Sequence, residues 1–135
     1  MPTTGAPSPA PEPRARILVV DDDPMITQLI ADMLSLDGYH VETAPNGVAA
    51  LAKVQGRRYD LILTDLHMPE LDGAGLYREL ARWQAHRPRK IIFLTGTAGE
   101  SETHRIVQET GLPLLRKPFN VAELLELVRK TLGSP

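Results

Sequence analysis

Short apolar runs recur along the chain and alternate with longer segments whose apolar residues are spaced three or four apart. The short runs are rich in aliphatic and β-branched residues and show little alternation with polar ones, which is typical of strands buried on both faces. Five such runs predict strands at 16–20, 40–44, 60–64, 90–95 and 113–117.

The segments between these runs have helical spacing, which places an apolar stripe along one side of a helix. The predicted core-facing stripes are Ile26, Leu29, Ile30 and Met33; Val48, Leu51 and Val54; Leu76, Leu80 and Trp83; Ile106 in a weaker segment at 100–110; and Val121, Leu124, Leu125, Val128 and Leu132. Residues typical of helix ends support them: Pro24 suits a first turn, Asn46 and Asn120 suit N-caps, and Gly38 and Gly111 suit C-terminal ends.

Strands that alternate with helices predict an α/β fold, a doubly wound parallel sheet of five strands with helices on both faces and right-handed crossovers. In such sheets, ligands bind beyond the carboxyl ends of the strands. The residues that follow each strand are therefore the first candidates for function.

The beginning of the chain differs in composition from the rest. Five of the first 13 residues are proline and large apolar side chains are nearly absent, so this stretch cannot bury enough surface to offset its ordering entropy. We expect residues 1–14 to form a flexible tail and residues 15–133 to form one folded domain, as the length of 135 residues suggests.

Charge and composition exclude several classes of function. The 15 basic and 17 acidic residues are mixed along the chain and give a net charge of -2, so we expect neither nucleic acid nor a membrane surface as a partner. Cysteine is absent, and no apolar run approaches the roughly 20 residues of a membrane span. These features predict a cytoplasmic protein.

Reactive side chains stand at several of the predicted strand ends: Asp21, Asp22 and Asp23 after the first, Asp65 after the third, Thr95 in the fourth and Lys117 in the fifth. Each has an ordinary structural interpretation, since Asp23 before Pro24 suits a helix cap, threonine suits strands, and lysine is usually solvated. The combination is harder to explain in this way. Because parallel strands end at one edge of a sheet, we expect these groups to converge on one point.

At these residues the chain resembles a known family. The stretches "ILVVDDDP", "LILTDLHMPELDG", "FLTGTA" and "LLRKPF" resemble the CheY-like receiver domain of two-component response regulators, over residues 16–132. The stretch "GLPLLRKPF" is also similar to receivers attached to hybrid histidine kinases. This resemblance implies a flavodoxin-like sheet with strand order 2-1-3-4-5. The order follows from the resemblance and not from the pattern of residues.

The resemblance also implies roles for the candidate residues. Asp65 would accept a phosphoryl group, and Thr95 and Lys117 would contact the phosphoryl oxygens. Mg²⁺ or Mn²⁺ would bind to Asp22, Asp65 and the backbone carbonyl of His67, with Asp21 acting through water. The donor would be a histidine kinase or a histidine phosphotransfer protein, and the downstream partner is not indicated. The Lys117–Pro118 bond is a candidate for the cis form.

The resemblance thus implies a phosphoacceptor signalling domain that promotes its own phosphorylation and dephosphorylation, and not a conventional enzyme. There are two alternatives. A small phosphatase or phosphotransferase with an aspartate nucleophile would carry a second acid two residues later, where this chain has His67. A receiver-like interaction module that is never phosphorylated is the third interpretation. The domain could stand alone or belong to a larger regulator or hybrid kinase.

One position departs from the family pattern. Receivers of this type usually have tyrosine or phenylalanine three residues before the lysine, and this chain has Leu114. We therefore expect weaker coupling between the phosphoryl site and the face formed by segments 100–110 and 120–132.

Overall fold

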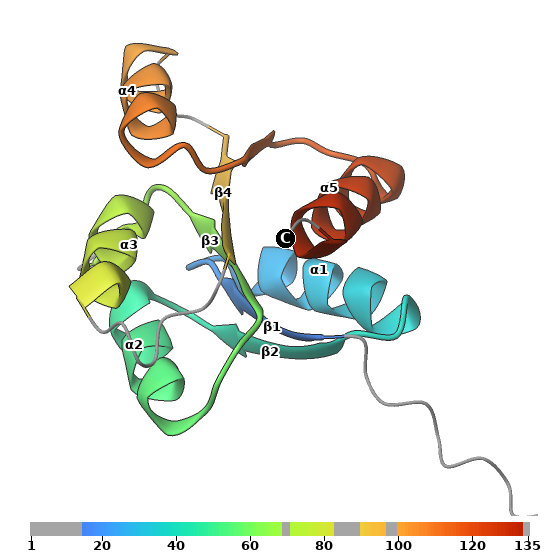
Figure 1. Ribbon diagram of the computed structural model, residues 1–135. Helices are drawn as coiled ribbons and strands as arrows, with labels where there is room; N and C mark the ends of the chain where they lie inside the picture. The colour runs from blue at the N-terminus through green and yellow to red at the C-terminus, as the bar shows by residue number, and fades with distance from the viewer. Residues whose placement is uncertain (1–14, 69–70, 83–89, 97–99, 134–135) are drawn as a thin grey trace, which may run out of the picture.

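The computed structural model describes residues 15–68, 71–82, 90–96 and 100–133. These residues form one parallel sheet of five strands in the order β2-β1-β3-β4-β5. Helices cover both faces of the sheet (Figure 1). The predicted fold class and strand order are confirmed. The expected tail at 1–14 lies outside the described residues.

The strands lie close to the predicted positions. They are β1 (Arg16–Val20), β2 (His40–Ala44), β3 (Leu61–Asp65), β4 (Lys90–Thr95) and β5 (Leu114–Arg116). The third strand begins one residue later than predicted and includes Asp65, which pairs with Leu94 of β4. The fifth is shorter at both ends than predicted. Pro113 at its start has no N–H for a ladder, although its carbonyl still accepts a hydrogen bond from Phe93.

The helices are α1 (Pro24–Leu36), α2 (Gly47–Gly56), α3 (Gly73–Arg82), α4 (Glu100–Thr110) and α5 (Val121–Gly133). None of the described helices is long and apolar enough to cross a bilayer. The predicted end signals are confirmed for α1 and α2, where the side chains of Asp23 and Asn46 accept backbone N–H groups of the first turn. Gly38 and Gly111 follow α1 and α4 with positive φ angles of 95° and 67°.

Asn120 caps α5 as predicted, in a reciprocal arrangement. Its side chain accepts the N–H of Glu123 at 2.7 Å, and the Glu123 carboxylate accepts the N–H of Asn120 at 3.1 Å. This capping box fixes the point at which the chain enters α5, shortly after Lys117.

Two apolar layers sandwich the sheet. One contains side chains of α2, α3 and α4 against β1, β3 and β4, and the other contains side chains of α1 and α5. The three inner strands are almost entirely buried. A sheet covered on both faces explains why these strands lack alternation of apolar and polar residues.

Part of the predicted core was wrong. Leu29, Val48 and Val121 were expected to face the core, but 48%, 54% and 44% of their surface is exposed. The buried stripes are narrower: Thr27, Ile30 and Leu34 in α1, Gly47, Ala50 and Val54 in α2, and Leu124 and Val128 in α5. A helix on a twisted sheet buries only the side that faces the strands. Ile106 is buried as predicted, and Trp83 lies outside the described residues.

Candidate functional site

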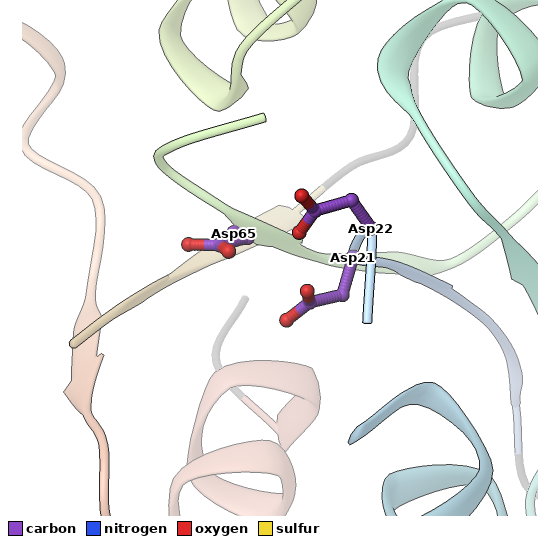
Figure 2. A group of neighbouring side chains, drawn as sticks. All are labelled: Asp21, Asp22 and Asp65. Atoms are coloured by element: carbon purple, nitrogen blue, oxygen red, sulfur yellow. The ribbon is translucent and has the colours of Figure 1, made fainter. Parts of the chain in front are cut away.

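Three carboxylates meet where β1 and β3 end. These strands are neighbours, with Val20 opposite Thr64, so the residues that follow them lie side by side. Asp21, Asp22 and Asp65 each place a carboxylate oxygen within 4.8 Å of the others. Figure 2 shows the three side chains gathered at this edge of the sheet.

Asp21 is held from two directions. One of its carboxylate oxygens accepts the N–H of Asp23 at 3.0 Å, and the other accepts a hydrogen bond from the Lys117 ammonium at 2.8 Å. Only 2% of its surface is exposed. Asp22, by contrast, is exposed. The pair therefore offers one fixed carboxylate and one that solvent reaches freely.

Lys117 follows β5, the edge strand next to β4, and its side chain reaches the same group of carboxylates. Its backbone N–H donates to the Thr95 carbonyl at 2.7 Å, directly after β5. Its Nζ lies 2.8 Å from Asp21 Oδ2 and 3.4 Å from Asp65 Oδ2. The Lys117–Pro118 peptide bond is cis, as expected. Burial alone would lower the pKa of Lys117, but its hydrogen bond to Asp21 and the charge of Asp65 outweigh burial and raise it.

Asp65 is buried and sits in an unfavourable electrostatic environment. Burial raises the pKa of the Asp65 carboxyl, and the charge of Asp21 raises it further. Lys117 and the backbone N–H of His67, which donates to Asp65 Oδ1 at 3.3 Å, lower this pKa only in part. Added positive charge at this carboxylate would therefore be favourable.

Thr95 supplies a hydroxyl that has no partner. Its residue is 2% exposed, and its Oγ1 makes no hydrogen bond to any part of the chain that the structure describes. A buried hydroxyl without a partner costs free energy, so a ligand that accepts or donates a hydrogen bond here is favoured. Gly96 follows it. A Cβ added at Gly96 would lie 3.5 Å from the Lys117 side chain.

The donor atoms fit a hard divalent cation. Carboxylate and carbonyl oxygens are the ligands that Mg²⁺ and Mn²⁺ prefer, and three carboxylates within ligand distance of one another repel unless a cation lies between them. The sheet thus brings five of the candidates from the sequence to one edge: Asp21, Asp22, Asp65, Thr95 and Lys117. The carbonyl of His67 belongs to the segment directly after Asp65, and its place in a ligand set stays a prediction.

Two contributions to this site were not foreseen. Asp23 was expected only to cap α1, but its N–H also holds Asp21. Gly73 begins α3 so close to β3 that an added Cβ would lie 2.5 Å from the Asp65 carbonyl oxygen. The sequence "LDG" gave a possible signal of a close backbone approach, but it is equally typical of an ordinary turn.

The chain matches known proteins along most of its length. The sequence signature of the response regulator receiver domain matches residues 17–129. Sensor histidine kinase GacS of Pseudomonas protegens is 33% identical over 121 residues, which cover 87% of this chain and 13% of that kinase. Response regulator MprA of Mycobacterium sp. (strain KMS) is 38% identical over 117 residues, which cover 87% of this chain and 50% of the regulator. The chain spans half or less of the length of these two relatives.

Solved structures show the same fold. Chemotaxis protein CheY4 of Vibrio cholerae has a TM-score of 0.78 at 33% identity, covering 87% of this chain and 98% of that one. The receiver domain of a signal transduction histidine kinase from Syntrophus aciditrophicus has a TM-score of 0.80 at 29% identity, covering 88% and 90%. The chain therefore belongs to the response regulator receiver domain family of two-component signalling.

Proposed function

We propose that this chain accepts a phosphoryl group from phosphohistidine onto Asp65 in a reaction that depends on Mg²⁺. The observation that carries the proposal is the position of Lys117, whose ammonium bridges Asp21 and Asp65 beside a third carboxylate. An ammonium shared between two carboxylates can release one of them to a phosphoryl group while it keeps the other.

The chain's own residues have distinct roles in the proposed transfer. A carboxylate oxygen of Asp65 attacks phosphorus, an O–P bond forms, and the N–P bond of phosphohistidine breaks. The electron pair of that bond goes to the imidazole nitrogen. Lys117 Nζ, 3.4 Å from Asp65, and the unpaired Thr95 hydroxyl would donate hydrogen bonds to phosphoryl oxygens. Asp21 would keep Lys117 in place.

Asp22, Asp65 and the His67 carbonyl would hold Mg²⁺ or Mn²⁺, with Asp21 acting through water. When bound, the ion would supply positive charge beside carboxylates that otherwise repel an approaching anion. The raised pKa of Asp65 is consistent with this assignment, because burial and then the charge of Asp21 raise it and the groups that lower it do not fully offset them.

The test is phosphorylation by a small donor. Incubation with acetyl phosphate and Mg²⁺ should add one phosphoryl group, seen by intact mass, and Asp65→Asn should abolish the addition. Addition that survives in the Asn variant would remove Asp65 from this role. A chain that stays unmodified while a control receiver reacts would instead support the alternative of an interaction module that is never phosphorylated.

The protein donor would dock beside α1. Met25 and Leu29 lie one turn apart on this helix, are 79% and 48% exposed, and follow closely after Asp22. A helix of a histidine kinase or phosphotransfer protein could cover them while it presents its histidine to Asp65. Leu29→Glu should then slow transfer from a protein donor and leave transfer from acetyl phosphate unchanged. The cytoplasmic location expected from the sequence stays a prediction.

A further inference from the structure

The segment between β3 and α3 is described at both ends, at 66–68 and 71–72, but not between them. Its ends are joined by the Gly73 N–H, which donates to the Leu66 carbonyl at 3.2 Å. The absence of a side chain at Gly73 lets the start of α3 lie against the Asp65 backbone. This loop begins with Leu66 and His67, directly after the proposed phosphoacceptor, and Leu71 lies four residues beyond His67.

Leu71, near the end of this loop, packs closely against two glycines, Gly47 and Gly75. A Cβ added at Gly47, the first residue of α2, would overlap the Leu71 carbonyl oxygen and lie 2.9 Å from Leu71 Cβ. A Cβ added at Gly75 in α3 would lie 2.7 Å from Leu71 Cδ1. Real Cβ atoms essentially never approach other atoms more closely than 3.0 Å. We call Gly47, Leu71 and Gly75 the Leu71 latch.

The two sides of the latch differ in rigidity. The start of α2 is fixed by the Asn46 cap, whose side chain accepts the Ala49 N–H at 2.8 Å, and by the buried side chains of Ala50 and Val54. Leu71 is only half-buried. An atom added at Gly47 would meet the Leu71 backbone, which cannot rotate away as a side-chain end can. The loop and not the helix should therefore move.

We propose that Gly47 is a positioning residue that acts through Leu71 to hold the β3–α3 loop where the His67 carbonyl can complete the metal site. Gly47 touches neither the metal nor the phosphoryl group. It lies in α2, whereas every proposed ligand lies at or after the end of a strand, and its contact with the loop is to the backbone and Cβ of Leu71. The proposal rests on the proposed function, because it requires a metal ion at Asp22 and Asp65.

The experiment measures Mn²⁺ affinity directly, from the electron paramagnetic resonance signal of the free ion. Gly47→Ala should weaken Mn²⁺ binding about tenfold, the effect typical of displacing the support of a metal ligand. Leu71→Ala empties the latch without adding an atom and should weaken binding in the same direction. This second variant decides the matter if Gly47→Ala does not fold.

Two controls lie in the same helix. Gly56→Ala adds a methyl group with no neighbour within 4 Å and should leave Mn²⁺ affinity unchanged. Val54→Ala removes a buried side chain two turns beyond Gly47 in α2, so it should lower the denaturation midpoint but bind Mn²⁺ as the wild type does. It separates positioning from general destabilisation.

The outcomes are distinguishable. Unchanged affinity in Gly47→Ala and Leu71→Ala would overturn the latch while the wild-type affinity leaves the proposed function standing. Equal loss in Val54→Ala, measured where every variant is folded, would overturn it as well, because destabilisation would then explain the effect. A wild-type chain that binds no Mn²⁺ would overturn the proposed function itself, and the latch with it.

Discussion

Asp65, the proposed phosphoacceptor, has surroundings that disfavour its charged form. Its carboxylate is buried next to the fixed carboxylate of Asp21, and Lys117 is shared between the two. Burial and the charge of Asp21 together raise the pKa of Asp65 above its ordinary value of 3.8. The folded chain therefore holds the Asp65 proton more tightly than the unfolded chain does. The free energy of unfolding consequently falls as the pH rises from 3.8 to the higher pKa of the folded chain.

We accordingly expect Asp65→Asn to be more stable than the wild type at neutral pH in the absence of divalent metal. Asparagine has nearly the same shape and no charge to desolvate. The difference should shrink as the pH falls below 3.8, where the wild-type carboxyl is protonated in both states. Urea denaturation at several pH values measures it. A less stable Asn variant at neutral pH would contradict the assigned repulsion.

Bound Mg²⁺ should reverse this order of stability, so that the wild type becomes more stable than Asp65→Asn. A ligand that binds only the folded state at 100 times its Kd stabilises that state by about 2.7 kcal/mol. Mg²⁺ at such a concentration should stabilise the wild type by this amount, and the Asn variant by clearly less, because one proposed ligand has lost its charge. The same urea series with added Mg²⁺ provides the comparison.

At the scale of elements, the carboxylate of Glu42 links β2 by its side chain to β1 and to the segment after α2. Glu42 accepts hydrogen bonds from Arg57 at 2.7 Å, Tyr59 at 2.8 Å and Arg16 at 3.2 Å. Burial would raise the pKa of Glu42, but the hydrogen bonds from Tyr59 and Arg57 and the nearby positive charges outweigh burial and lower it to about 2. Burial, followed by the hydrogen bond to Glu42 and the charge of Glu42, raises the pKa of Tyr59 to about 12, although the charges of Arg57 and Arg16 oppose this rise.

Glu42→Gln should therefore destabilise the chain at neutral pH, by about 1–2 kcal/mol, because hydrogen bonds to a charged group are replaced by weaker ones and the arginines are partly solvated. The contribution of the ionised carboxylate is fully present above pH 4.5 and is lost as the pH falls toward about 2. Urea denaturation across this range should show the two curves converging. Tyr59→Phe, which removes one hydroxyl only, should cost about 1 kcal/mol.

α4 is the helix with the weakest attachment. Among those of its side chains that the structure describes, Ile106 alone is buried, and Figure 1 shows the helix standing away from the sheet. The ion pair between Arg78 of α3 and Glu109 of α4 spans 3.1 Å but is exposed, so it adds little. Local opening of α4 should cost less free energy than opening of α1 or α5.

Hydrogen exchange would show this difference directly. Amides of α4 should exchange well before those of α5, which buries both Leu124 and Val128. Ile106→Ala should remove the protection of α4 while it lowers global stability by less than about 2 kcal/mol, because the helix can detach alone. Leu124→Ala should cost about 2–5 kcal/mol. Equal protection in α4 and α5 would contradict the expected weak attachment.

At the scale of the whole molecule, the sequence predicted what depends on local pattern. Strand positions follow from apolar runs, and the convergence of Asp21, Asp65 and Lys117 follows from their places after parallel strands. The strand order itself came from the family resemblance. Helix faces were predicted less well, because Val48 and Val121 have the right spacing but lie beyond the narrow side that contacts the strands.

Contacts between distant segments could not be predicted from the pattern. Arg16, Glu42 and Arg57 are unremarkable charges in sequence, and they meet only because β2 lies beside β1 and α2 ends nearby. The close contact between Gly47 and Leu71 could not be predicted either, because nothing in the sequence around a glycine after an N-cap indicates which residue packs against it. Such contacts require the complete fold.

Leu114 lies between the proposed phosphoryl site and α4 in the family pattern that the sequence resembles. This residue lies opposite Phe93 in the β4–β5 ladder and is half-buried against the layer that contains Ile106. Related receivers usually have an aromatic ring here, which moves inward when the threonine turns toward the phosphoryl group. Leucine has no ring with two alternative packing positions, so it should contribute less differential free energy between the two states.

We therefore expect activation by beryllofluoride to be felt mainly at the site. Amide chemical-shift changes should concentrate around Asp65, Thr95 and Lys117 and remain modest over α4 and α5. Leu114→Phe, which restores a ring, should extend these changes to α4, where the weak attachment at Ile106 offers little resistance. Two-dimensional NMR spectra of both chains, with and without beryllofluoride, provide the measurement. Large changes across α4 and α5 in the wild type, or dimerisation through that face on activation, would show that coupling in this chain does not need the aromatic side chain.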